Sequence, residues 1–324
     1  MDGLLIVDKP AGPTSHDVVA RMRRALGERR IGHTDTLDPA ATGVLCLVLG
    51  RATRLAQFLS NSDKTYEAVV RFGFATDTAD AQGRATGPAS AAAMPGRDEI
   101  DAALGAFRGT FLQQPPAFSA KKIDGKRSHK LARARRRAGQ VGQVSDTLHA
   151  STQVSDTAVS AIPAPTSVTA FAIDILTVND DTVTLRVECS AGFYVRSLAH
   201  DLGETLGMGA HLASLRRTRT GDFTVEQAIA FDAAERDPRQ AAAAVIPLPD
   251  MLPGFPAVTL TAAGVRRAIN GCELGPGDTI SGLDESRITS AESLSRLLDA
   301  AGSLVGIARS AGRPGLLHPA VVLM

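Results

Sequence analysis

The 324-residue chain contains no tryptophan, only two tyrosines and only three cysteines. Cys46, Cys189 and Cys272 lie far apart, which indicates neither a clustered metal site nor a disulfide framework. The sequence also shows no apolar run long enough to cross a membrane, no signal peptide and no glycine-rich phosphate-binding motif. These absences predict a protein with no membrane segment, no metal and no nucleotide cofactor, in which Cys46 and Cys189 are reduced core thiols.

The composition is that of an ordinary globular protein, because 44% of the residues are hydrophobic and 21% are charged. The length allows one large and one small domain, each with a core. A net charge of +1 gives no overall sign of a nucleic-acid partner. However, residues 121–137 hold nine lysines and arginines and a single acidic residue, Asp124. Such a stretch suits an RNA backbone, although charge runs are also common on solvated surfaces.

The stretch from Gly32 to Gly50 places a carboxylate, Asp38, directly before an apolar segment. Pro39 disfavours helical backbone at the residue before it, so Asp38 should be extended or in a turn. The apolar run 44–49 then predicts a buried strand. Asp38 is therefore a candidate catalytic group, and the alternative is an ordinary turn in which its side chain bonds to its own backbone.

The spacing of apolar residues predicts helices and strands around this stretch. The expected strands are residues 4–7, 44–49, 66–72 and 183–189, and the expected helices are residues 16–26, 52–59, 99–107 and a segment between Gly192 and Gly207. Thr14 or Ser15 can cap the first helix and Gly27 can end it. Residues 241–256 are rich in alanine and proline and predict a boundary before a small domain with several strands.

Five short motifs resemble, in order, those of the TruB family, the bacterial tRNA pseudouridine-55 synthases. They are Asp8-Lys9-Pro10 with Gly12 to Ser15, Gly32-His33-Thr34 with Thr36 to Gly43, Ser62 to Tyr66, Gly192 to Arg196, and Gly209 to His211 with Leu215 to Arg217. One such match would be weak, but five in order are specific. The resemblance implies the pseudouridine-synthase α+β fold, built on a mixed, mainly antiparallel sheet with flanking helices, plus a small C-terminal β-rich, PUA-like domain.

The resemblance also implies domain bounds and an RNA-gripping insertion. Residues 1–250 correspond to the catalytic domain, with the insertion at about 119–165, and residues 255–324 to the PUA-like RNA-binding domain. The insertion residues implied to contact RNA are Lys121, Lys122, Lys126 and Arg127. The sequence departs from the family pattern at His129, where a tyrosine is usual.

By the same resemblance, Asp38 is the catalytic carboxylate and Arg196 is its charge partner. The residues implied to bind the substrate or hold the motif loops are His33, Tyr66, Tyr194, Arg196, Leu215, Lys9 and Lys64. His33 would help displace the target base, and the two tyrosines would stack on it and line its pocket. Without the motifs, the tyrosines would be interpreted as core rings and His33 as a solvent-facing turn residue.

The implied reaction isomerises uridine 55 in the T-loop of tRNA, after the base has been flipped out of its stack. The bond from N1 to C1′ breaks, the base turns, and C5 joins C1′, so no cofactor is needed. The implied partner is the tRNA T-arm, with no membrane and no obligatory protein partner, and the chain would be a cytoplasmic monomer. Two alternatives are a dyskerin-like synthase directed by guide RNA, which the long basic insertion fits less well, and a non-catalytic RNA-binding or tRNA-folding protein.

Overall fold

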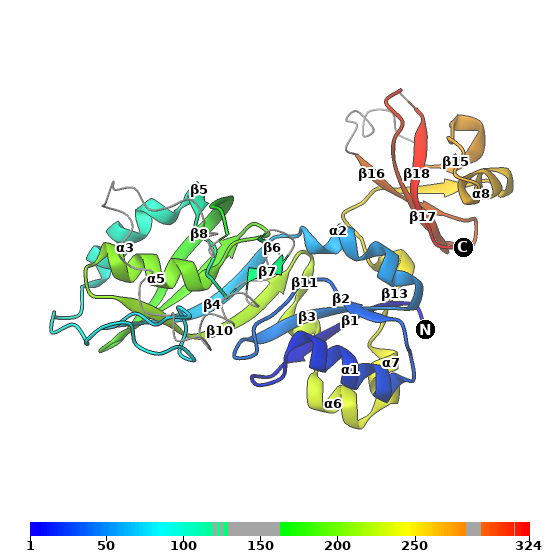
Figure 1. Ribbon diagram of the computed structural model, residues 1–324. Coiled ribbons are helices and arrows are strands. Elements are labelled where there is room, and N and C mark those ends of the chain that lie inside the picture. Colours follow the sequence, from blue (N-terminus) through cyan, green and yellow to red (C-terminus); the bar gives the residue numbers. More distant parts are fainter. Residues whose placement is uncertain (119–121, 124–125, 129–162, 283–292, 314) are drawn as a thin grey trace. The chain divides into compact units, whose positions relative to one another are not determined.

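The computed structural model describes residues 1–118, 122–123, 126–128, 163–282, 293–313 and 315–324. The chain forms two compact units, and unit 1 joins Met1–Ser62 to Arg219–Met324 while unit 2 is Asp63–Thr218. Both units mix helices and strands (Figure 1), which confirms the predicted α+β class. No helix within these described ranges is both long enough and apolar enough to cross a membrane.

The centre of unit 1 is an antiparallel pair of strands, β1 (Gly3–Lys9) and β3 (Thr42–Leu49). Three short strands extend this sheet: β2 (Ile31–His33) beside β3, and β12 (Ile229–Ala230) and β13 (Ile246–Pro247) beside β1. The β1 and β12 pair is parallel and the others are antiparallel, so the predicted mixed sheet is confirmed. A further short strand, β11 (Phe223–Thr224), pairs with the end of β10.

Both faces of β1 and β3 are buried, which explains why these strands are apolar at nearly every position. Leu5 and Val7 share a core with α1 (Ser15–Leu26), α6 (Phe231–Arg236) and α7 (Pro238–Ala243), which gather beside these strands in Figure 1. Leu4 and Ile6 share a second core with the 3₁₀ helix η1 (Gly50–Leu55) and α2 (Ala56–Ser60). The remaining 3₁₀ helices in the described residues are η2 (Gly105–Phe107), η3 (Val225–Gln227), η4 (Leu248–Asp250) and η5 (Pro276–Asp278).

Helix α1 begins one residue before its predicted start and ends at the predicted Leu26. The Thr14 side chain accepts a hydrogen bond from the Asp17 backbone N–H, and the Asp17 carboxylate accepts one from the Thr14 N–H, which completes a capping box. Gly27 has φ 62 and ends the helix, as the sequence predicts. The cap fixes the start of α1 next to the loop that carries the first family motif.

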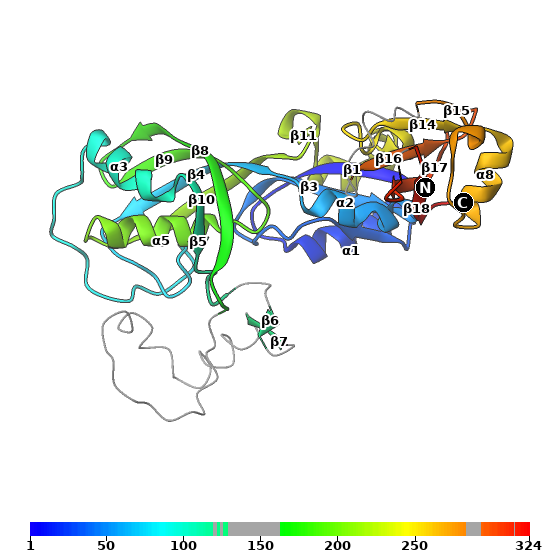
Figure 2. The ribbon, with the colours of Figure 1, turned by 90° about the horizontal axis from the view of Figure 1, so that it is seen from above.

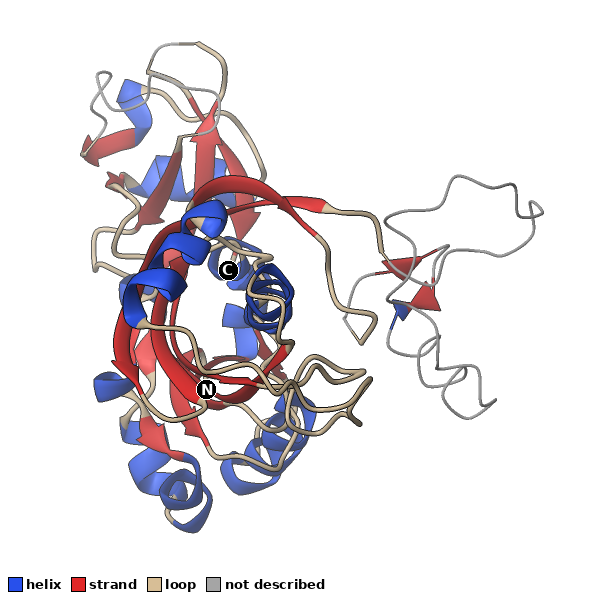
Figure 3. Ribbon diagram, turned by 90° about the vertical axis from the view of Figure 1, so that its left-hand side faces the viewer, coloured by secondary structure: helices blue, strands red, loops and turns tan. Residues whose placement is uncertain are grey.

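Unit 2 is a curved antiparallel sheet with two helices on one face. Its strands run in the order β10 (Ala210–Thr220), β4 (Lys64–Phe72), β9 (Thr182–Cys189), β8 (Thr166–Val178) and β5 (Gly109–Gln113). Helices α3 (Arg97–Leu104) and α5 (Val195–Thr205) contribute to one shared core on this sheet (Figures 2 and 3). The sequence predicts β4 and β9 but misses β8, where the outward-facing Phe171 and Leu176 obscure the alternation.

Gly203 lets helix α5 lie directly against the start of β10. A Cβ atom at this position would be 2.1 Å from the Ala210 backbone nitrogen, a group that cannot move without displacing the strand. We expect Gly203→Ala to lower the free energy of unfolding by about 2–3 kcal/mol. The matched control is Gly105→Ala, because a Cβ atom there meets nothing within 4 Å and the backbone is right-handed helical. Urea denaturation should show the control unchanged or stabilised by up to about 1 kcal/mol, and equal midpoints for the two variants would contradict this close packing.

A second sheet forms near the C-terminus. Its strands run in the order β15 (Thr279–Ser281), β14 (Ala257–Leu260), β16 (Leu294–Leu298), β17 (Leu304–Ser310) and β18 (Leu317–Val322), with helix α8 (Ala262–Ile269). Val258, Leu260, Leu297 and Val305 belong to a core of this sheet. The predicted β-rich C-terminal part is thus confirmed, while the domain bounds at 250 and 255 stay a prediction.

Only a small part of the predicted RNA-gripping insertion belongs to the described residues. Strands β6 (Lys122–Ile123) and β7 (Lys126–Arg127) pair, with Lys122 opposite Arg127. Lys121 and His129 lie outside the described residues. The RNA contacts of the insertion therefore stay a prediction.

Candidate active site

Asp38 is the first residue of a hydrogen-bonded β-turn at the mouth of β3. The Ala41 N–H donates to the Asp38 carbonyl at 3.1 Å, and Pro39 occupies the second position, where its fixed φ suits the turn. The preceding residue, Leu37, is buried, and its N–H and carbonyl both bond to the Ser15 hydroxyl, at 2.9 and 3.1 Å. The predicted turn is confirmed, and its backbone is held on both sides of the half-buried Asp38.

Lys9 holds the loops around Asp38 together. Its side chain is fully buried, and its ammonium group donates to the carbonyl oxygens of Pro10 at 2.8 Å, Pro39 at 3.1 Å and Ala41 at 2.7 Å. Two of these carbonyls belong to the Asp38 turn. The sequence resemblance implies that Lys9 either binds the substrate or holds the motif loops. The three contacts favour the second role, in which Lys9 positions the Asp38 turn.

Replacing Lys9 by methionine should destabilise the protein, because the unbranched apolar part of the side chain is largely kept while the buried carbonyls lose their donor. Unsatisfied buried acceptors cost about 1–3 kcal/mol each, so we expect the free energy of unfolding to fall by about 2–4 kcal/mol. Chemical denaturation measures this loss. Arg236→Met, on an exposed surface, is the control and should change stability by less than about 0.5 kcal/mol. A Lys9→Met protein as stable as the parent would show that Lys9 does not hold these loops.

His33 ends strand β2, five residues before Asp38. It lies opposite Leu47 in the pairing of β2 with β3, and its ring is edge-on to His16, with ring centroids 5.0 Å apart. The next residue, Thr34, donates its N–H to the Cys46 carbonyl, and its own carbonyl accepts from the Ser60 hydroxyl at 2.8 Å. The segment between His33 and Asp38 is therefore held at Thr34 by these two bonds and at Leu37 by the Ser15 hydroxyl.

Arg196 lies in the first turn of α5, and its side chain is 7% exposed. Its guanidinium donates to the Phe118 carbonyl at 3.0 Å and to the Thr78 carbonyl at 3.4 Å. The Asp80 carboxylate lies 4.0 Å from the same guanidinium. A cation near a helix N-terminus is opposed by the helix dipole, and this carboxylate with the two carbonyls compensates for that position.

The Asp80 loop is built so that one carboxylate oxygen faces Arg196. The other oxygen accepts from the Thr78 hydroxyl at 2.6 Å and from the Gln82 N–H at 3.0 Å. Between Thr78 and Asp80, Ala79 has φ 58, and its carbonyl accepts from the Leu212 N–H of β10. The sequence shows this segment only as a polar turn, and nothing local marks Asp80 as a neighbour of Arg196.

Tyr194 directly precedes α5 and is held through its backbone. The Gln113 amide accepts from the Tyr194 N–H at 2.8 Å and donates to the Tyr194 carbonyl at 3.0 Å. Gln113 is 2% exposed, and its place at the end of β5 puts this amide beside the helix start. The sequence does not single out Gln113, because its role depends on a strand that the sequence does not predict.

The other candidate residues of unit 2 lie on two neighbouring strands. Lys64 and Tyr66 point to the buried side of β4, and Leu215 of β10 is partly buried against the same core. Five of the candidate residues belong to unit 2, namely Lys64, Tyr66, Tyr194, Arg196 and Leu215. The other three, Lys9, His33 and Asp38, belong to unit 1. The pairing of Asp38 with Arg196 across the two units stays a prediction.

Comparison with known proteins identifies the family. A model of the N-terminal domain of TruB family pseudouridylate synthases matches residues 23–154, and a model of the tRNA pseudouridylate synthase B C-terminal domain matches residues 196–238. The chain is 40% identical to tRNA pseudouridine synthase B of Solibacter usitatus, over the full length of both chains. It belongs to the TruB family.

Other TruB family members and solved structures agree with this assignment. The chain is 42% identical to tRNA pseudouridine synthase B of Thermobifida fusca, over 85% of this chain and 87% of that one. A crystal structure of a Cbf5-Nop10-Gar1 complex contains a chain with a TM-score of 0.68 and 25% identity, covering 99% of this chain and 85% of that chain. The predicted family, enzyme class and pseudouridine-synthase fold are confirmed.

Proposed function

We propose that this TruB family enzyme converts uridine 55 in the T-loop of tRNA to pseudouridine. The observation that carries the proposal is the 40% identity, over the whole chain, to a tRNA pseudouridine synthase B. The uninterrupted motif around Asp38 adds support, since it places a carboxylate in a turn held by Lys9 and Ser15.

In the proposed mechanism, the uridine leaves its stack and enters the site, and His33 helps to displace the target base. The Asp38 carboxylate assists cleavage of the N1–C1′ bond at the sugar, and Arg196 orients it. After rotation of the base, a bond forms between C5 and C1′. The C5 proton is lost and N1 gains a proton, so product and substrate have the same composition.

The remaining candidate residues receive supporting roles in this proposal. Tyr66 stacks on the base near the C5 proton, Tyr194 and Leu215 line the pocket, and Lys64 holds a phosphate or a motif loop. Lys121, Lys122, Lys126 and Arg127 grip the tRNA backbone, and residues 255–324 form a PUA-like RNA-binding domain. The burial of Tyr66 in the core supports a fixed position for its ring, and the two hydrogen bonds of Gln113 support a fixed backbone at Tyr194.

We further propose that the enzyme acts as a monomer in the cytoplasm, without guide RNA or an obligatory protein partner. The relatives near 40% identity are named tRNA pseudouridine synthase B, whereas the similar chain in the Cbf5-Nop10-Gar1 complex is 25% identical. This difference favours the stand-alone enzyme over the guided one.

Release of tritium from C5 of uridine tests the reaction directly. The purified protein alone, with a tRNA transcript labelled at C5, should release one equivalent of tritium per tRNA. A transcript with cytidine at position 55 is the control and should release none. If the protein binds the tRNA but releases no tritium, the proposed activity is wrong, and the guided enzyme or the RNA-binding protein is favoured instead.

A further inference from the structure

A basic surface lies in unit 1, away from the Asp38 turn. It consists of exposed arginines from two short segments. The end of α1 and the loop after it contribute Arg23, Arg24, Arg29 and Arg30, and η1 contributes Arg51 and Arg54. We call this group the arginine surface. It is a strong local excess of positive charge in a chain whose net charge is only +1.

The pairing of β2 with β3 brings the two segments of the arginine surface together. The Gly50 N–H donates to the Arg30 carbonyl at 2.7 Å, and Arg51 is the next residue. The Arg23 guanidinium donates to the Ile31 carbonyl at 2.5 Å, and Ile31 lies opposite Leu49. The two segments are therefore adjacent in the fold, although they are some twenty residues apart in the chain.

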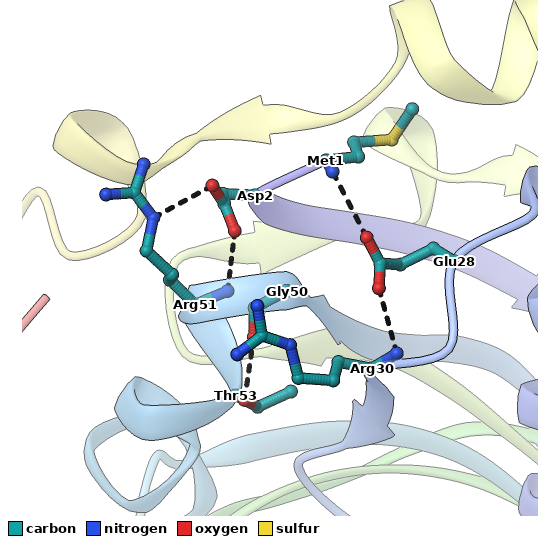
Figure 4. Close-up of polar contacts among 7 residues, drawn as sticks. All are labelled: Met1, Asp2, Glu28, Arg30, Gly50, Arg51 and Thr53. Carbon is teal, nitrogen blue, oxygen red and sulfur yellow. Dashed lines mark hydrogen bonds and ion pairs between the residues drawn. The ribbon is translucent and has the colours of Figure 1, made fainter. Parts of the chain in front are cut away.

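Two carboxylates lie near the arginine surface, and one of them, Asp2, forms an ion pair with its member Arg51. Asp2 binds the Arg51 backbone N–H at 2.6 Å and its Nε at 2.9 Å, and Glu28 binds the Met1 amino group and the Arg30 backbone N–H (Figure 4). Among the described residues, no carboxylate forms an ion pair with the guanidinium of Arg24, Arg29 or Arg30. Several exposed arginines whose guanidinium groups form no ion pair within the described residues suit phosphate groups.

The arginine surface and the Asp38 turn lie at opposite ends of strand β3. Asp38 precedes Thr42 at one end, and Gly50 follows Leu49 at the other, so eight strand residues, about 25 Å, separate them. A single ligand that contacts both must span this distance. A flipped uridine and its loop are too short, whereas a tRNA helix that continues beyond the T-arm is long enough.

We propose that the arginine surface binds the phosphate backbone of the tRNA outside the T-arm. This inference rests on the proposed function, because it assigns a second contact to the same substrate. Contacts to phosphate add affinity without reading bases, and each one adds to the salt dependence of binding. The surface would hold the body of the tRNA while the T-loop enters the site.

Charge reversal with two lengths of RNA tests this proposal. Arg29→Glu/Arg30→Glu should raise the KM and Kd for full-length tRNA by about 10-fold and reduce the slope of log Kd against log salt by about 1–2. With a T-arm hairpin, KM should change by less than about two-fold. The neutral pair Arg29→Gln/Arg30→Gln should give an intermediate effect, and circular dichroism verifies that each variant is folded.

Arg236→Glu/Arg239→Glu is the matched control, because it reverses two exposed arginines elsewhere in unit 1. It should leave KM for both RNAs within about two-fold. Equal losses on full-length tRNA and hairpin, or no loss on either, would overturn the proposal, and the second result would indicate a partner other than tRNA. Absence of pseudouridine with the parent protein on both RNAs would instead refute the proposed function, so the two failures are distinguishable.

Discussion

Asp38→Asn is expected to lower the rate of pseudouridine formation by at least about 10³-fold while tRNA binding is retained. The amide has nearly the same shape as the carboxylate, but it carries no charge and is a poor nucleophile, so the assistance at the sugar is lost. The turn should persist, because its backbone bonds involve Ala41, Leu37 and Lys9 rather than the Asp38 side chain. Single-turnover kinetics and filter binding measure the two properties separately.

Asp35→Asn is the control for this prediction, since it makes the same chemical change three residues earlier in the same loop. It should keep the rate within about 10-fold of the parent. If Asp38→Asn retained the parental rate, Asp38 would not be the catalytic carboxylate, and another acidic residue of the site would have to take its role.

Arg196→Lys is expected to lower kcat by about 10²-fold or more. The guanidinium contacts the carbonyls of Phe118 and Thr78 at once and lies beside Asp80, and a single ammonium group cannot reproduce this planar geometry. The positive charge remains, so the loss would report geometry rather than charge. Steady-state kinetics with full-length tRNA should show the change mainly in kcat.

Arg186→Lys, on the exposed side of β9, is the matched control and should leave kcat within about two-fold. Thermal denaturation of both variants separates a kinetic effect from unfolding. A parental kcat for Arg196→Lys would mean that positive charge alone is sufficient at this position, and the proposed orientation of Asp38 by the guanidinium would be wrong.

The parts of the fold that depend only on residues close together in the sequence could be predicted from it. The Asp38 turn follows from Pro39, and the limits of α1 follow from Thr14 and Gly27, because caps and turns act within a few residues. Alternation predicted β4 and β9, since one face of each strand is buried and the other is more polar. The family motifs then suggested which of these elements carry the site.

Contacts between distant segments could not be predicted in this way. Gln113 and Tyr194 are 81 residues apart and meet only because β5 lies at the edge of the unit 2 sheet. Asp80 reaches Arg196 because its loop pairs with Leu212 of β10. The arginine surface likewise depends on the pairing of β2 with β3. Sequence patterns indicate burial and local geometry. Which distant residues become neighbours in space depends instead on the order and register of the strands.

The measurement that tests the central claim most directly is the position of the modified base. The purified protein, without cofactor, is incubated with an unmodified tRNA transcript, and pseudouridine is mapped by chemical labelling and primer extension. The account predicts one stop, at uridine 55 of the T-loop, that is absent with Asp38→Asn. A stop at another uridine, or a stop at uridine 55 that persists with Asp38→Asn, would contradict it.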